Sequence, residues 1–257
     1  MAASGCLPFS MLQAARAVPD GATQIGLGLQ GAIAGHKQVG ASDLREGRID
    51  QRPTGVLTVS LRHGLGDGQD FGVTAPVSVP PWGAVGVAAG LFVDRKWSWS
   101  AGSQTRALAP GVGLYFENSG RLDGHGESVT NRFLFAQLPF LIGVPLGDRG
   151  GEGPAELVIG PRLGAGLALI HDGFEDSVSS LLTAPPGSAR PFATTGLGLG
   201  LPVRVSRSIT LMPEVDANLA VHGNWVNDAT FHADGLVLGR GNFTWAFSFG
   251  LGLLFGG

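Results

Sequence analysis

The residues that could do chemistry are histidines and aspartates in the polar segments between apolar runs. His171 and Asp172 are adjacent, His222 follows another apolar run, and His232 and Asp234 lie in the last polar segment. Such groups act as general acids and bases only within hydrogen-bonding reach of one another and of a substrate. Nothing in their spacing brings them together, and such residues in an external loop are usually just solvated. We therefore expect no catalytic site.

The sequence also gives no support for a metal site or a nucleotide-binding site. His125 with Glu127, and His36 alone, lack the spacing of metal ligands. The run GLGLG at residues 196–200 lies inside an apolar alternation with no helix after it, which argues against a phosphate-binding loop. The net charge of −3 gives no reason to expect nucleic acid as a partner. We expect no metal and no cofactor.

The stretch over residues 243–255, FTWAFSFGLGLLF, shows what organises the chain. Large apolar side chains occupy every second position, and small or weakly polar ones lie between them, with Leu254 as the exception. Because side chains alternate between the two faces of a strand, one face is bulky and apolar while the other carries no charge. This pattern predicts a transmembrane β-strand with its apolar face toward lipid and its small face toward a lumen.

Similar alternation recurs from Thr23 onward. Charged residues are only 14% of the chain, 43 residues are glycine, and no apolar run is long enough for a membrane helix. We predict an all-β fold: a closed antiparallel transmembrane β-barrel over residues 23–257, of about ten strands, with about eight or twelve as alternatives. A soluble calycin-like barrel is the competing fold.

The connections between the predicted strands alternate between longer and tighter segments. Outer-membrane barrels have short periplasmic turns and longer external loops. The alternation therefore predicts that both termini lie on the periplasmic side. Residues 79–83, which are short, and residues 94–104, which are long and irregular, depart from it.

The last strand carries a family resemblance. Its residues Ser248, Gly250, Leu253 and Phe255 form a polar residue, a glycine two positions later, and apolar residues that end in an aromatic. This resembles the C-terminal signal of bacterial outer-membrane β-barrels. The resemblance implies a porin-like barrel in outer-membrane lipid of a Gram-negative bacterium, recognised by the barrel-assembly machinery. It indicates no particular family.

Residues 1–22 form a separate N-terminal arm. The sequence around Cys6, ASGC, resembles the end of a bacterial lipoprotein signal, which implies an acyl lipid on Cys6; an unmodified cysteine is the alternative. Residues 7–18 could form one short amphipathic helix. We expect the arm to link the anchor to the barrel, and a plug in the lumen is the alternative.

Two further sets of side chains follow from the strand pattern. The ionisable residues expected to face the lumen are Arg62, Glu117, Arg162, Arg204, Glu214 and Asp216. We interpret them as ion pairs that join neighbouring strands, and a charged constriction that selects solutes is the alternative. The residues expected in interfacial aromatic belts are Trp82, Trp97, Trp99 and Trp245.

These features favour a non-enzymatic outer-membrane barrel that anchors, scaffolds or presents loops to a protein partner in an outer-membrane complex. A narrow passive or gated pore for small solutes is the second hypothesis. A surface hydrolase is the third. Omptins are outer-membrane proteases on barrels of this size, with Asp and His near the external rim, but no omptin motif surrounds His171 and Asp172.

Overall fold

The computed structural model describes residues 13–38, 52–79, 86–119, 129–147, 155–172, 189–223 and 241–256. Within these residues no helix is long and apolar enough to cross a membrane. The strands are β1 (Thr23–Gln38), β2 (Arg52–Gly66), β3 (Gln69–Val79), β4 (Gly86–Ala101), β5 (Gln104–Leu108), β6 (Gly111–Ser119), β7 (Val129–Leu146), β8 (Ala155–Asp172), β9 (Ala189–Gly200), β10 (Val203–Arg204), β11 (Ile209–Gly223) and β12 (Gly241–Gly256).

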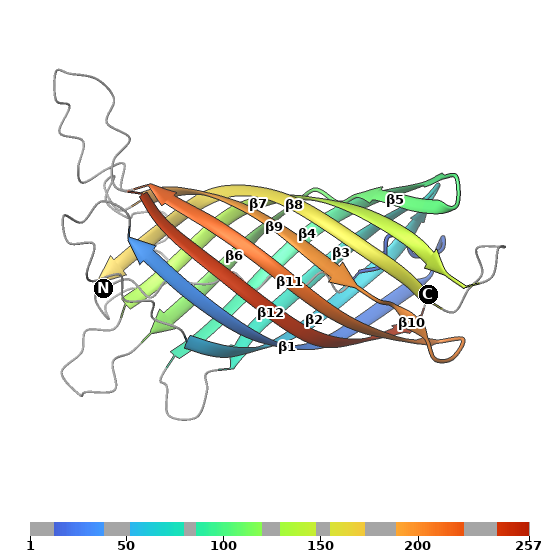
Figure 1. Cartoon of the computed structure of the whole chain (residues 1–257), viewed down its shortest axis with the longest axis horizontal. Helices are drawn as coiled ribbons and strands as arrows, with labels where there is room; N and C mark the ends of the chain where they lie inside the picture. The colour runs from blue at the N-terminus through green and yellow to red at the C-terminus, as the bar shows by residue number, and fades with distance from the viewer. Residues whose placement is uncertain are drawn as a thin grey trace, which may run out of the picture.

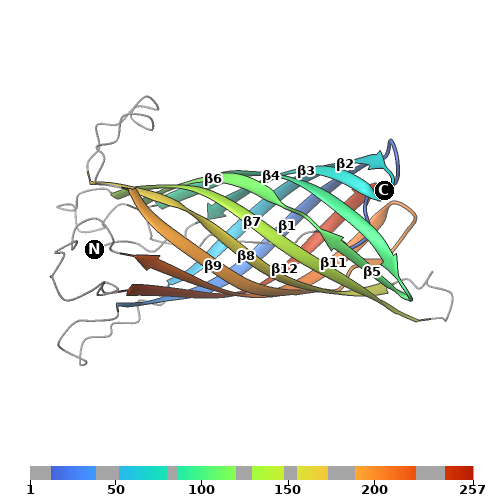
Figure 2. The same ribbon diagram turned by 90° about the horizontal axis from the view of Figure 1, so that it is seen from above.

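The strands close into one antiparallel barrel (Figures 1 and 2). Strands that are neighbours in chain order pair with one another, except β5 with β6 and β9 with β10. Strand β12 pairs with β1 along nearly their whole lengths, from Gln24 opposite Gly256 to Gln38 opposite Asn242. Strands β5 and β6 share one place between β4 and β7, and β9 and β10 share one place between β8 and β11. The predicted all-β closed barrel of ten strands is therefore confirmed.

Prolines mark the two places where a strand is interrupted. Pro110 lies between β5 and β6, and Pro202 lies between β9 and β10. Proline has no N–H to donate to a ladder, and although Pro161 and Pro213 stay within paired strands, regular pairing stops at these two prolines. The carbonyl groups of both prolines still accept backbone hydrogen bonds, from Arg95 and Glu156, so the wall stays continuous.

One end of the barrel carries short hairpin turns, and we call it the turn end; the opposite end is the loop end. Strands β2 and β3 meet at Asp67 and Gly68, and β4 and β5 meet at Gly102 and Ser103. The expectation of a long irregular segment over residues 94–104 was wrong, because β4 continues to Ala101 and the turn has only two residues. The segments that connect strands at the loop end lie outside the described residues.

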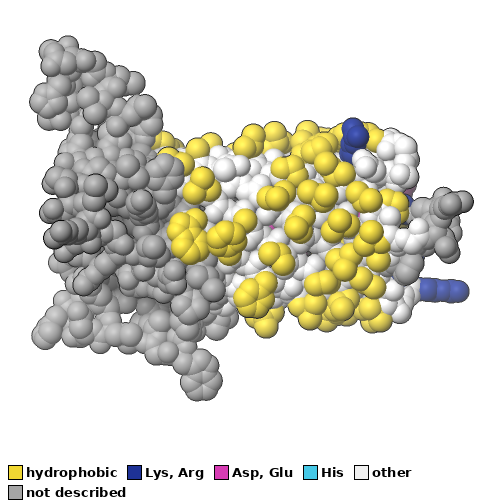
Figure 3. All heavy atoms as spheres, viewed as in Figure 1, with side chains coloured by type: hydrophobic (Ala, Val, Ile, Leu, Met, Phe, Trp, Pro, Cys, Tyr) yellow, Lys and Arg dark blue, Asp and Glu magenta, His cyan; other side chains and the backbone are white. Residues whose placement is uncertain are grey.

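The outer face of the barrel is apolar. Leu29, Leu163 and Phe249 are each more than 60% exposed, and many other large aliphatic and aromatic side chains project outward beside them. Figure 3 shows these side chains spread over the described surface, with Lys and Arg only toward the turn end on that side. A contiguous apolar surface of this extent is what a barrel presents to lipid.

The tryptophans lie toward the two ends of this surface. Trp97 and Trp99 are exposed on β4 near the turn end, where Trp99 contacts the Phe140 ring at 6.2 Å between centroids. Trp245 is half-buried on β12 toward the loop end. Trp82 lies outside the described residues.

Candidate functional site

The main polar feature of the lumen is a charge network that crosses β2, β3 and β4. Arg62, Gly72 and Asp94 lie side by side in the ladder register of these strands. Arg62 Nη1 and Nη2 donate to the two carboxylate oxygens of Asp94 at 3.1 and 2.6 Å, and Nε and Nη2 donate to Asp70 Oδ1 at 2.9 and 2.5 Å. The arginine therefore joins three neighbouring strands from the inside.

Lys96 completes this network and makes it neutral. Its Nζ lies 3.0 Å from Asp70 Oδ2, and its side chain is only 1% exposed. Two cations, Arg62 and Lys96, thus face two carboxylates, Asp70 and Asp94. Buried charges persist only when they are paired and hydrogen-bonded in this way.

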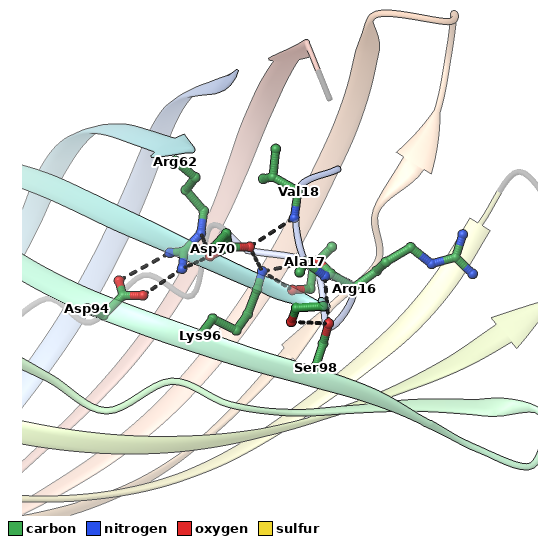
Figure 4. A network of polar contacts seen from close by, with 10 residues as sticks. Arg16, Ala17, Val18, Arg62, Asp70, Asp94, Lys96 and Ser98 are labelled. Carbon is green, nitrogen blue, oxygen red and sulfur yellow. Dashed lines mark hydrogen bonds and ion pairs between the residues drawn. The ribbon is translucent and has the colours of Figure 1, made fainter. Parts of the chain in front are cut away.

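The same network holds the backbone of the N-terminal segment, residues 13–18 (Figure 4). Lys96 Nζ donates to the carbonyl oxygens of Ala14 and Arg16, both at 3.1 Å. The N–H of Ala17 donates to Ser98 Oγ at 3.1 Å, and the N–H of Val18 donates to Asp70 Oδ2 at 2.9 Å.

Apolar contacts seat the segment against the neighbouring part of the wall, which follows β4 around the barrel. Ala15 is fully buried in a cluster with Ala107, Leu141 and Val158, which come from β5, β7 and β8. A Cβ atom at Gly143 would collide with the carboxyl group of Glu156 and lie 2.9 Å from the Cβ of Ala15, so only glycine fits at position 143 beside the segment.

A tight reversal leads from this segment into β1. The N–H of Ala22 donates to the carbonyl of Pro19, while Gly21 and Ala22 exchange backbone hydrogen bonds with Gly64 of β2. A Cβ atom at Gly64 would lie 1.9 Å from the carbonyl oxygen of Pro19, so only glycine allows this close approach.

The short helix expected within residues 7–18 is not formed over its described part, residues 13–18. The wall side chains take the backbone carbonyl and N–H groups that a helix would pair internally. The position of residues 13–18 corresponds to the plug alternative for this part of the arm. Cys6 lies outside the described residues, and its lipidation stays a prediction.

A second buried network also faces the lumen, on the side of the barrel opposite the first. Arg162 on β8 donates to Asp216 Oδ1 at 2.8 Å and to Asn218 Oδ1 at 2.9 Å, both on β11. Gln30 Nε2 on β1 donates to Asp216 Oδ2 at 2.9 Å and to Ser248 Oγ at 2.8 Å. These contacts connect β8, β11, β12 and β1 through side chains.

An aromatic cluster lines the lumen toward the loop end, and sequence reasoning did not single it out. Tyr115, Phe133, Phe135 and Phe192 are buried together, and Phe92 packs against them. Phe92 stacks on Phe135 with centroids 5.7 Å apart, and Phe133 meets Phe192 edge-on at 6.0 Å. By strand parity all five rings fall on the inward face, opposite the large apolar side chains that indicate contact with lipid.

The predicted lumen charges divide into three groups. Arg62, Arg162, Glu214 and Asp216 are buried in the lumen wall. Arg204 is exposed beside the turn end; it pairs with Thr210 of β11, so it keeps the inward face of the ladder but lies at the rim of the barrel. The side chain of Glu117 lies outside the described residues.

The described residues contain no group of three or more His, Cys, Asp or Glu that could hold a metal ion. His171 on β8 and His222 on β11 have β9 between their strands. The side chains of both histidines and of Asp172 lie outside the described residues, as do His232 and Asp234 entirely. The site described above is therefore one of ion pairing and backbone binding.

Comparisons with known proteins concern the barrel as a whole. No protein-family model matches the sequence, and no curated protein matches it. The structure is similar to the outer membrane protease OmpT from Escherichia coli, at 11% identity and a TM-score of 0.46, covering 92% of this chain and 96% of that one.

Two other solved structures are similar over comparable lengths. The translocator domain of the autotransporter NalP from Neisseria meningitidis has 14% identity and a TM-score of 0.43, covering 89% of this chain and 87% of that one. The outer membrane protein OprG from Pseudomonas aeruginosa has 13% identity and a TM-score of 0.34, covering 90% or more of each chain (93% and 98%). None of these similarities assigns an activity to the chain.

Proposed function

We propose that this chain is an integral β-barrel of a bacterial outer membrane that performs no chemistry and serves as a membrane anchor or scaffold for a protein partner. The observation that carries the proposal is the seating of residues 13–18 in the lumen, where Lys96, Ser98 and Asp70 turn their polar groups toward that segment. Both charge networks join strands of the wall, which supports a structural role for the buried ions.

The proposal includes an orientation. Gln24 near the start of β1 lies opposite Gly256 at the end of β12, so both strands meet the turn end together. Because outer-membrane barrels keep short turns in the periplasm, we place the turn end there and the loop end outside. A lipid on Cys6 and recognition of the last strand by the barrel-assembly machinery belong to the same proposal.

Conductance in planar lipid bilayers tests the anchor role. We expect the purified full-length protein to insert without producing steady channels. Steady open channels from the unaltered protein would contradict a purely anchoring role.

A gated pore for small solutes is the second candidate, and one observation favours it. Residues 13–18 form no strand pairing with the wall and are held by side chains alone, so their departure would not break the barrel. Replacing Ala15 with Phe removes the fit against Leu141 and Val158. If the protein is a gated pore, this variant should form conducting channels in planar bilayers. If the protein is an anchor whose lumen the aromatic cluster also blocks, this variant should form none.

A further inference from the structure

We propose that the turn end of the lumen is a peptide-binding site that recognises a short segment through its backbone, and that residues 13–18 are its resident occupant. This proposal goes beyond the anchoring role and does not depend on it. The predicted ligand is a peptide with a small side chain at the position of Ala15 and with free N–H groups at the positions of Ala17 and Val18.

The wall presents hydrogen-bond donors to the carbonyl groups of the segment and hydrogen-bond acceptors to its N–H groups. Lys96 offers N–H groups to two carbonyls, whereas Ser98 and Asp70 offer oxygens to two successive N–H groups. No side chain of residues 14–18 takes part in these four bonds. Binding through main-chain groups gives affinity that tolerates sequence change, and a side-chain pocket supplies selectivity.

The wall residues are fixed before any peptide arrives. Lys96 is held by Asp70, which in turn accepts two hydrogen bonds from Arg62. The hydroxyl of Ser98 donates to the carbonyl of Gly68 at 3.0 Å, which leaves its lone pairs aimed at the segment. Such a preorganised site loses little conformational freedom on binding.

Lys96 also gives a reason why the site needs an occupant. An ammonium group has three N–H donors, and here they meet Asp70 Oδ2 and the carbonyls of Ala14 and Arg16. Without the segment, two donors of a buried cation lose their protein acceptors. Arg62 and Lys96 balance Asp70 and Asp94 within the wall, and a departing segment also removes the charge of Arg16, which acts on the half-buried Glu156.

Selectivity lies at Ala15. The side chain is fully buried against Ala107, Leu141 and Val158, while the Arg16 side chain is exposed and points away from the network (Figure 4). The site therefore requires a small residue at the position of Ala15, whereas the side chain at the position of Arg16 lies outside the network, near enough to Glu156 to interact with its charge.

The test uses the full-length chain with the substitution Ala15→Phe, which expels the resident segment for lack of space. Hydrogen exchange of the Ala17 and Val18 amides reports the expulsion, because both N–H groups are bonded to the wall in the unaltered protein. The probe is a blocked, fluorescently labelled peptide with the sequence of residues 13–18. We expect it to bind Ala15→Phe saturably, and to fail to bind the unaltered protein, whose tethered segment competes at an effective concentration of about 1 mM.

Peptide variants distinguish backbone recognition from nonspecific adsorption. N-methylation at the Val18 nitrogen should weaken binding at least about 10-fold, because a hydrogen bond to a carboxylate is lost. Phe at the Ala15 position should abolish binding, and Lys at the Arg16 position, which keeps the charge that acts on Glu156, should leave it unchanged. In the protein, adding Ser98→Ala should weaken binding by about 2- to 10-fold.

Two results would overturn the proposal. One is full protection of the Ala17 and Val18 amides in Ala15→Phe, which would show that the site does not require a small residue. The other is unprotected amides with no peptide binding, or with binding indifferent to N-methylation. Neither result changes the conductance expected of the unaltered protein, so the anchoring role is judged separately.

Discussion

Gly72 lies directly beneath the guanidinium group of Arg62. A Cβ atom at this glycine would stand 2.5 Å from Arg62 Nη1 and 3.0 Å from Asp94 Oδ2. Because Gly72 is the β3 residue between Arg62 on β2 and Asp94 on β4, its missing side chain lets the arginine reach across a whole strand.

The second network repeats this arrangement on the other side of the barrel. Arg162 on β8 passes over Gly196 of β9 to reach Asn218 on β11, and these residues share one ladder row. A Cβ atom at Gly196 would lie 2.8 Å from Arg162 Nε. Glycine in the lumen wall thus makes room for arginines that join strands not adjacent to one another.

We predict that Gly72→Ala destabilises the barrel by about 1–3 kcal/mol, because the new methyl group displaces Arg62 from its two carboxylates. Gly200→Ala is the matched control. Its Cβ atom would meet only the flexible end of Met212, at 2.7 Å, and otherwise Val158 at 4.0 Å. Urea unfolding in lipid vesicles measures both variants, and equal midpoints would show that the space above Gly72 is not needed.

We predict that Arg62→Met costs about 3–5 kcal/mol of unfolding free energy, because it leaves Asp70 and Asp94 buried with only Lys96. Arg204→Met changes the same residue type at an exposed position and should stay within about 0.5 kcal/mol of the unaltered protein. The same unfolding assay compares them. A cost at Arg204 as large as that at Arg62 would contradict the assignment of the buried network.

Residue periodicity was enough to predict the barrel. Strand β12 alternates bulky and small residues over nearly its whole length, and the outward side chains of Phe247, Phe249 and Leu251 are those expected. Such a strand alternates because its outward face contacts lipid and carries bulky apolar side chains, whereas its inward face lines the lumen and carries small or polar ones. The same parity placed Arg62, Arg162 and Asp216 inward without any knowledge of their partners.

The partners themselves could not be predicted from periodicity. Asp94 and Lys96 lie in the segment over residues 94–104 that was expected to be irregular, because charge usually marks a loop in soluble proteins. In a barrel, an inward position near a strand end accommodates charge, so charge does not mark the end of the strand. The seating of residues 13–18 depends on backbone groups, which leave no side-chain pattern in the sequence.

We predict that Asp67→Val costs about 1–2 kcal/mol and that Asp67→Asn is neutral. Asp67 has a φ of 50° and is followed by Gly68 at 71°, which is the geometry of a two-residue hairpin turn. Asparagine tolerates a positive φ, whereas a β-branched residue does not. Thermal unfolding of both variants checks this. An undisturbed Asp67→Val would mean that the turn does not hold the conformation described.

The final prediction concerns depth in the membrane. Leu29 and Val205 are similarly exposed, at 63% and 66%, but Leu29 lies well inside β1 whereas Val205 lies beside the turn end. If the outer face contacts lipid, Leu29→Arg places a charge deep in hydrocarbon and should cost about 2–4 kcal/mol, whereas Val205→Arg near the interface should cost about 0–1 kcal/mol. Unfolding by guanidinium in lipid vesicles gives both values. A water-exposed surface would make the two substitutions equally harmless, since exposed positions of a soluble barrel accept arginine wherever they lie along its axis.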